Sequence, residues 1–81
     1  MQKGDDTLNF NYNKLKGRII EIFVTQSEFA KQMGWSERTM SLKMNGTVYW
    51  KQPEIVKAIN LLKLDYSDIV VYFFTIEVQV A

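Results

Sequence analysis

The stretch QSEFAKQMGWSERTMSLKMNG, residues 26–46, decides the fold of this chain of 81 residues. Thr25 stands directly before it and Glu28 follows three residues later, which is the capping-box pattern of a helix start. Gly34 can adopt the left-handed conformation that ends a helix and turns the chain sharply. The pattern therefore predicts a short helix that starts near Gln26 and ends at Gly34.

A second short helix is predicted directly after this turn. Ser36 can cap its start, and Asn45-Gly46 carries the same kind of stop signal as Gly34. Ala30 is small enough to let the two helices approach closely. The apolar side chains that would hold the pair against the rest of the domain are Phe29, Met33 and Met40. The stretch thus predicts a helix-turn-helix over residues 26–46.

Apolar residues recur at helical spacing in three further segments, which begin near Asn13, Pro53 and Ser67. Their predicted core residues are Leu15, Ile19, Ile22 and Phe23 in the first, Ile55, Ile59 and Leu62 in the second, and Ile69, Tyr72 and Phe73 in the third. The sequence therefore predicts a mainly α domain of five helices over residues 8–81, preceded by a disordered N-terminus, residues 1–7.

Both ends of this domain alternate apolar and polar residues, which is typical of strands. Residues 8–12 alternate Leu, Phe and Tyr with Asn, and residues 75–81 alternate Ile and Val with Glu and Gln. We expect the two ends to pair within one chain as a small two-stranded β ribbon that covers the helices. The alternative is that the C-terminal strand pairs with another chain and forms a dimer.

The composition excludes several kinds of chemistry. Without Cys and His the chain has no thiolate zinc site, no disulfide and no Ser-His-Asp set. Asp5-Asp6 lies in the N-terminal segment, and the spacing of Asp65 and Asp68 is typical of a helix cap. We therefore expect no enzyme, no metal site and no cofactor.

Charge is distributed unevenly along the chain, although the net charge is only +1. Residues 1–51 hold eight Lys and Arg against five Asp and Glu, and residues 52–81 hold two against four. The basic half carries the helix-turn-helix. No apolar run reaches the ~18–20 residues of a membrane helix, and no signal-peptide pattern is present, so we expect a cytoplasmic protein without a membrane partner.

Residues 26–46 resemble the helix-turn-helix of phage Cro proteins and repressors along their whole length, and the flanking helices fit that family too. The SLKMNG run, Tyr49-Trp50 and the YFF of residues 72–74 are similar to small Cro-type regulators of Gram-positive temperate phages. The resemblance implies a phage-repressor-like DNA-binding domain that works in the cytoplasm of a bacterial host cell.

In this family the second helix of the motif lies in the major groove and reads base edges with its first residues. By resemblance, the base-reading positions are Ser36, Glu37, Arg38, Ser41 and Leu42, and the phosphate-binding positions are Gln26, Lys43, Asn45, Tyr49 and Lys51. Arg38 can bind guanine through two hydrogen bonds. The other interpretation is that Glu37 and Arg38 form a solvated, mutually paired helix face, and that Tyr49 packs inside, as we expect of Trp50.

Two functions stay open at this point. The resemblance implies a sequence-specific DNA-binding transcriptional regulator of a phage lysis/lysogeny switch, which binds double-stranded operator DNA. Because we expect the chain ends to pair within one chain, we expect a homodimer to be weak or to form only on DNA. The alternative is an antirepressor or modulator of repression that binds the cognate phage repressor protein. Glu37 and the weak basicity favour the second function, because non-specific DNA affinity grows with the number of phosphates neutralised. A helix-turn-helix is also a common helical corner in domains that bind no DNA.

Overall fold

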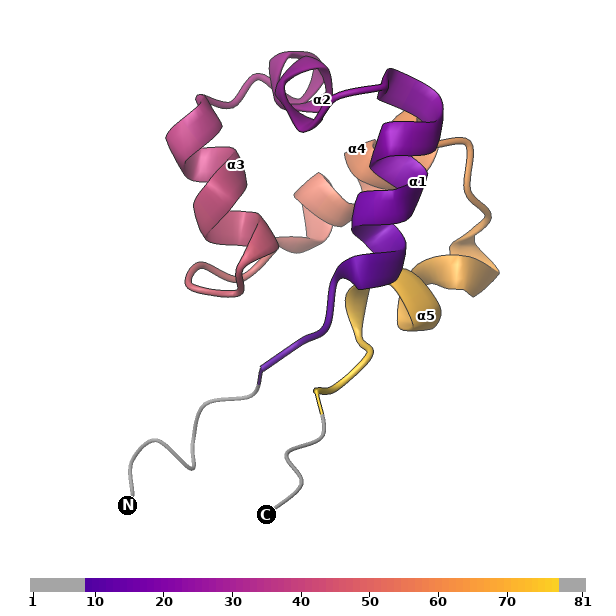
Figure 1. Cartoon of the computed structure of the whole chain (residues 1–81). Coiled ribbons are helices and arrows are strands. Elements are labelled where there is room, and N and C mark those ends of the chain that lie inside the picture. Colours follow the sequence, from indigo (N-terminus) through magenta and orange to yellow (C-terminus); the bar gives the residue numbers. More distant parts are fainter. Residues whose placement is uncertain (1–8, 78–81) are drawn as a thin grey trace.

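The chain folds into five α-helices around one apolar core, as seen in a computed structural model that describes residues 9–77. Within that range there is no β-strand, and no helix is long and apolar enough to cross a membrane. The helices are α1 (Asn13–Phe23), α2 (Gln26–Met33), α3 (Glu37–Met44), α4 (Gln52–Leu61) and, after a 3-10 turn η2 (Tyr66–Asp68), α5 (Ile69–Phe73) (Figure 1). The predicted mainly α fold with five helices is confirmed.

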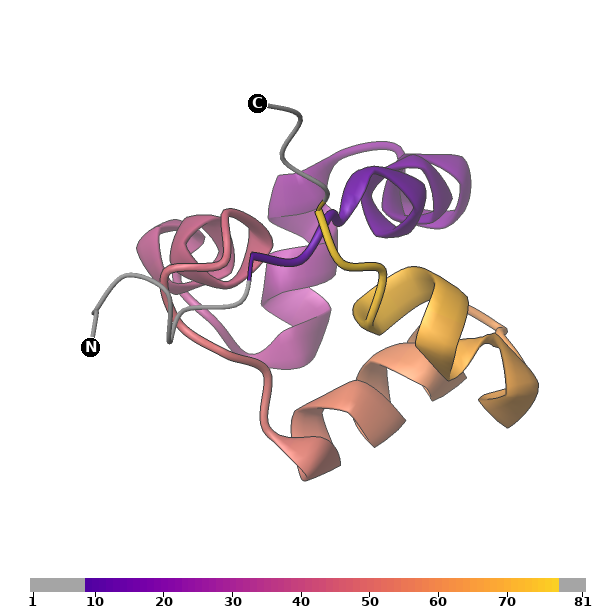
Figure 2. The same cartoon turned by 90° about the horizontal axis from the view of Figure 1, so that it is seen from below.

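The core lies where the amphipathic faces of these helices meet. α2 packs against α1, α3 and α4, and α5 lies between α1 and α4 (Figure 2). The largest fully buried side chains are Phe29, Leu15, Ile19, Met40, Ile59 and Leu62. Partly buried side chains that pack against them include Ile22, Phe23, Trp50, Ile69 and Tyr72. Each core residue predicted from helical spacing therefore contributes to the core.

The start of α2 uses half of the predicted capping box. Thr25 Oγ1 accepts a hydrogen bond from Glu28 N over 3.1 Å, as expected. The other half, a hydrogen bond from Thr25 N to the Glu28 carboxylate, is wrong, because Thr25 N donates instead to Phe23 O over 2.8 Å. The Glu28 carboxylate pairs with Lys31 Nζ at 3.3 Å on the exposed side of the helix.

The turn between α2 and α3 has the predicted local chemistry. Gly34 ends α2 with a left-handed backbone, φ +80°, and Ser36 Oγ accepts a hydrogen bond from Thr39 N over 3.1 Å at the start of α3. Gly46 repeats the left-handed stop after α3, with φ +82°. These short-range signals fix both ends of each helix, so the α2–α3 pair forms where the sequence predicts it.

Two further turns show how the remaining helices end and begin. Val24 follows α1 with φ +71° and ψ −44°, and the bond from Thr25 N to Phe23 O closes a tight three-residue turn around it. Such a turn with positive φ is strained for a β-branched residue. Before η2, Asp65 Oδ2 accepts from Ser67 N over 3.1 Å and Asp68 Oδ2 accepts from Asp65 N over 3.0 Å. The two carboxylates are therefore caps, as predicted.

The two ends of the described chain meet in a single antiparallel bridge. Phe10 pairs with Ile76, Asn11 N donates to Thr75 O over 2.7 Å, and Glu77 N donates to Asn9 O over 2.8 Å. The predicted pairing within one chain is therefore present, although it is a bridge and not a ribbon of two strands in the described range. Residues 1–7, predicted to be disordered, and residues 78–81 of the predicted strand lie outside the described residues.

Candidate interaction surface on α2 and α3

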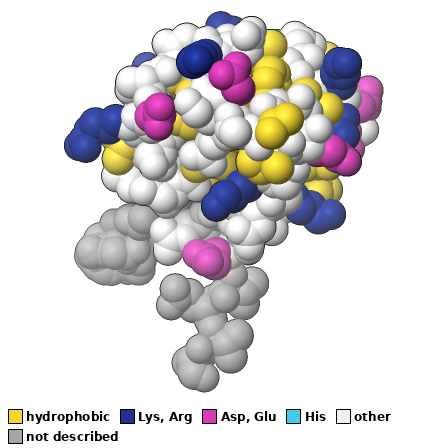
Figure 3. Space-filling model, turned by 45° about the horizontal axis from the view of Figure 1, so that its top comes forward, with side chains coloured by type: hydrophobic (Ala, Val, Ile, Leu, Met, Phe, Trp, Pro, Cys, Tyr) yellow, Lys and Arg dark blue, Asp and Glu magenta, His cyan; other side chains and the backbone are white. Residues whose placement is uncertain are grey.

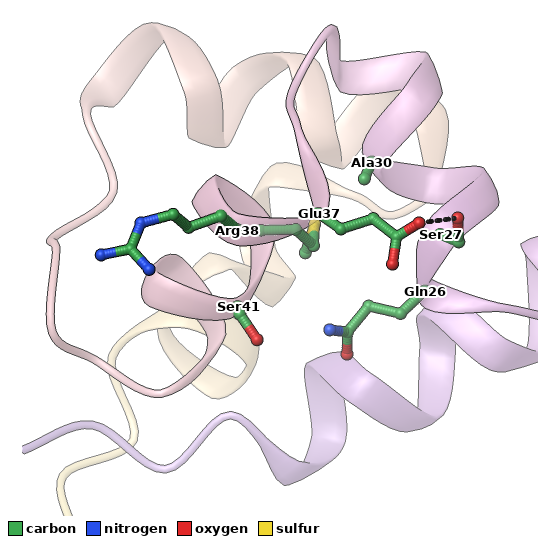
Figure 4. Close-up of a pocket in the computed structure, with 7 residues that line it drawn as sticks. Gln26, Ser27, Ala30, Glu37, Arg38 and Ser41 are labelled. Carbon is green, nitrogen blue, oxygen red and sulfur yellow. Dashed lines mark hydrogen bonds between the residues drawn. The ribbon is translucent and has the colours of Figure 1, made fainter.

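A shallow hollow separates the first turns of α2 and α3. It has a volume of about 400 Å³. Ala30 and Met40 form its apolar floor, since both are almost completely buried. The residues that line it are Gln26, Ser27, Ala30, Glu37, Arg38, Met40 and Ser41 (Figure 4). This hollow is the centre of the candidate surface.

The two charged side chains of this hollow point in different directions. Glu37 reaches across to α2, where Ser27 Oγ donates a hydrogen bond to Glu37 Oε2 over 3.2 Å. Arg38 extends away from α2 into solvent (Figure 4). The predicted pairing of Glu37 with Arg38 is therefore absent, since Glu37 bonds to Ser27. Each side chain is therefore exposed separately.

The structure brings the predicted base-reading residues together on α3 and its cap. Ser36, Glu37, Arg38 and Ser41 are exposed, and Leu42 is half-buried. Among the predicted phosphate-binding residues, Asn45, Tyr49 and Lys51 are exposed and Gln26 is half-buried. Their roles toward DNA stay predictions.

A second, polar hollow of about 250 Å³ adjoins the first. Gln26 and Ser41 line both hollows, and the second is also lined by Tyr12, Asn13, Lys16, Met44 and Asn45. The sequence pattern did not point to Lys16, because its position marks it only as a solvated residue of α1. The candidate surface therefore extends from α2 and α3 to the start of α1.

Lys43 departs from its predicted place at the surface. Its side chain is only 5% exposed, and its Nζ lies 2.7 Å from Glu54 Oε1 and 2.9 Å from Tyr49 O. Nζ also lies 5.3 Å from the centre of the Trp35 ring, in a cation–π contact. This corrects the expectation that Lys43 contacts phosphate, because its ammonium group is bound inside the domain.

Glu54 is the residue that pairs with Lys43, and the sequence pattern did not identify it. Its Oε1 accepts from Lys43 Nζ and also from Lys51 N, over 2.8 Å, and so caps the start of α4. Burial acts to raise the pKa of Glu54, but the hydrogen bonds from Lys43 and Lys51 and their positive charges outweigh it. The pKa of Glu54 therefore lies below its ordinary value. The carboxylate stays ionised and can neutralise Lys43.

The exposed charges of α2 and α3 cancel as a result. The two helices carry Glu28, Lys31, Glu37, Arg38 and Lys43, and Lys43 is neutralised by Glu54. Two acidic and two basic side chains stay exposed. Figure 3 shows acidic and basic side chains interspersed over this side of the molecule, without a continuous basic patch. In the described range no cluster of three or more Asp and Glu could hold a metal ion.

Fold and sequence both match a small helical phage protein connected with repression. The solution structure of the modulator of repression (MOR) of the temperate bacteriophage TP901-1 from Lactococcus lactis is similar to this chain, with a TM-score of 0.75 and 48% sequence identity. The match covers 86% of this chain and 95% of that one. A search of curated proteins finds no match.

The chain belongs to the family described as "protein of unknown function (DUF739)", which matches residues 8–76. The resemblance seen in residues 26–46 implied a phage regulator of the Cro and repressor kind. The matches support its connection with phages and repression, and they do not show the Cro and repressor family specifically.

Proposed function

We propose that this chain is a modulator of repression in a temperate phage and acts by binding the phage repressor protein through the α2–α3 surface. The similarity to MOR, at 48% identity, supports a role in the control of repression. This is the second of the two functions that the sequence left open.

The observation that carries the choice of partner is the balanced charge of the first hollow, whose charged lining residues are Glu37 and Arg38. DNA binding is driven largely by neutralising phosphates, so a DNA-reading surface needs an excess of Lys and Arg. Here α3 exposes Arg38 next to Glu37, while its other cation, Lys43, is bound to Glu54. The surface is therefore better suited to a protein partner than to a phosphate backbone.

The chemistry of Glu37 indicates which face of a repressor fits. The DNA-binding face of a repressor is basic because it contacts phosphates. The Glu37 carboxylate is held at the hollow by Ser27, and one of its oxygens can accept a hydrogen bond from a Lys or Arg of that face. Binding there would block the repressor from its operator.

The direct test is a calorimetric titration of the full chain with the N-terminal DNA-binding domain of the repressor encoded in the same phage genome. We expect a saturable complex, and we expect added operator DNA to compete with it. A repressor domain that binds operator unaffected by this protein would contradict the proposal.

Operator DNA is the second candidate partner, and Arg38 is the observation that favours it. Its guanidinium is exposed on the first turn of α3, where it can form two hydrogen bonds with guanine. If the chain binds DNA specifically, Arg38→Ala should reduce the preference for operator over scrambled DNA by about 1–3 kcal/mol without changing stability. Gel-shift titrations of both DNAs at one salt concentration measure this preference. Equal, weak binding of the parent protein to both DNAs would eliminate this candidate.

A further inference from the structure

A buried ion pair is an unusual feature in so small a domain. The side chain of Lys43 is 5% exposed and that of Glu54 is 22% exposed. Their contacts connect three segments: α3 through Lys43, the loop of residues 45–51 through Tyr49 O, and α4 through Glu54. Trp50 Nε1 adds a further bond from the loop, to Lys43 O over 3.3 Å.

Net stability does not explain why the pair is there. Taking two charges out of water costs roughly what their attraction returns, so a buried pair adds little compared with apolar side chains of similar size. The surroundings of Lys43 suit an apolar side chain, because the Trp35 ring lies against it and the Trp50 ring packs on Trp35, with ring centres 5.1 Å apart. A methionine could fill this space and contact the rings.

The ion pair adds a defined orientation of α3 relative to α4 and the loop between them. An apolar contact tolerates rotation and sliding, whereas the bonds from Lys43 Nζ to Glu54 and to Tyr49 O each demand one geometry. They connect the last turn of α3 to the first turn of α4 and to the loop between them. Since Glu37, Arg38 and Ser41 lie on the same short helix, its orientation decides where they point.

We propose that Lys43 and Glu54 are positioning residues for partner binding. They hold α3 and the 45–51 loop in the orientation that the partner recognises, and they contribute little net stability. The role in binding rests on the proposed function, namely recognition of a repressor through α2 and α3. Neither residue touches the partner.

The test replaces both charges at once. Lys43→Met/Glu54→Gln removes the ion pair, keeps the net charge of the chain, and keeps an oxygen at position 54 that can accept from Lys51 N. We expect an unchanged or higher Tm, faster amide hydrogen exchange in residues 37–51, and roughly ten-fold weaker binding of the repressor N-terminal domain. Lys43→Leu/Glu54→Gln repeats the test with a different apolar side chain.

The matched control is Lys31→Met/Glu28→Gln, which in the same way removes the exposed pair of α2, whose two residues line neither hollow. It should leave binding and amide exchange as in the parent protein. Repressor binding that is unchanged in both Lys43/Glu54 double variants would overturn the inference, and so would a large loss of Tm in both. If the parent protein itself does not bind the repressor, the proposed function fails. In that case amide exchange in the free protein still tests the positioning role. Unchanged protection of residues 37–51 in the Lys43/Glu54 double variants would refute it.

Discussion

Ser27 Oγ donates a hydrogen bond to Glu37 Oε2 over 3.2 Å and so links the first turn of α2 to the first residue of α3. The bond holds an acidic group at the edge of the hollow in a defined position. An exposed glutamate in a phosphate-contacting helix would oppose DNA binding, whereas a basic protein partner would be attracted to it.

Glu37→Gln tests this relationship. Gln can still accept the hydrogen bond from Ser27, so we expect unchanged stability and a loss of the negative charge alone. Affinity for the repressor domain should fall by up to roughly five-fold, which is the usual strength of an exposed ion pair. Calorimetry gives both affinities, and Glu28→Gln, on the exposed side of α2, serves as the control with the same charge change. A larger effect at position 28 than at position 37 would place the partner elsewhere.

Opposite effects are expected from the same substitution at two glycines. Gly17 lies within α1 and Gly34 has φ +80°, and a Cβ at either position would meet no atom within 4 Å beyond the adjoining residues and the backbone of its own helix. Gly17→Ala should therefore stabilise by about 0.5–1 kcal/mol through helix propensity. Gly34→Ala should cost about 1–2 kcal/mol through its left-handed backbone. Urea unfolding of both variants measures this. A Gly34→Ala variant as stable as the parent would show that the turn relaxes.

Strain at Val24 predicts that a smaller residue stabilises the protein. Val24 is 74% exposed and has φ +71°, so its side chain contributes little packing while its backbone is unfavourable. Val24→Gly should raise stability by about 1 kcal/mol, or Tm by roughly 4–8 °C. Val56→Gly, at an exposed position within α4, should have the opposite sign. A thermal melt in which both variants lose stability would contradict the strain at Val24.

The Lys43–Glu54 pair predicts a difference in acid stability. The pKa of Glu54 is lower in the folded protein than its ordinary value of about 4.5. The ionised carboxylate therefore stabilises the fold above that pH, and this contribution is lost as the pH falls through the folded pKa. Protonation also leaves Lys43 buried without its counter-charge. The parent protein should thus lose more stability between pH 6 and pH 3 than Lys43→Met/Glu54→Gln does, as measured by unfolding at each pH. If the stabilities of the two proteins fall in parallel as the pH is lowered, Glu54 does not titrate in this range.

Local signals in the sequence were sufficient to predict where the helices of the α2–α3 pair begin and end. Thr25, Ser36, Gly34 and Gly46 act within a few residues of themselves, so their roles in caps and turns follow from spacing alone. The exposed positions of α3 follow from the same helical period. The strain at Val24 gave no such signal, because a valine carries no preference for positive φ.

The place of Lys43 could not be predicted in the same way. Its partner Glu54 is 11 residues away, across a loop whose path is decided by tertiary packing. The spacing did carry a signal for its burial, since Lys43 follows the buried Met40 by three residues and so shares its face of α3. A lysine at such a position is normally assigned to solvent, because burying its charge is costly unless a counter-charge is available.

The bridge between Phe10 and Ile76 brings the start and the end of the folded unit together, with Asn9 and Glu77 joined by a hydrogen bond of 2.8 Å, on the side away from α2 (Figure 1). A unit whose two ends meet can be inserted as a cassette into a surface loop of another protein without forcing that loop apart. Placed in a fluorescent reporter in this way, residues 9–77 would keep α2 facing outward, and binding at that surface could be followed inside living bacteria.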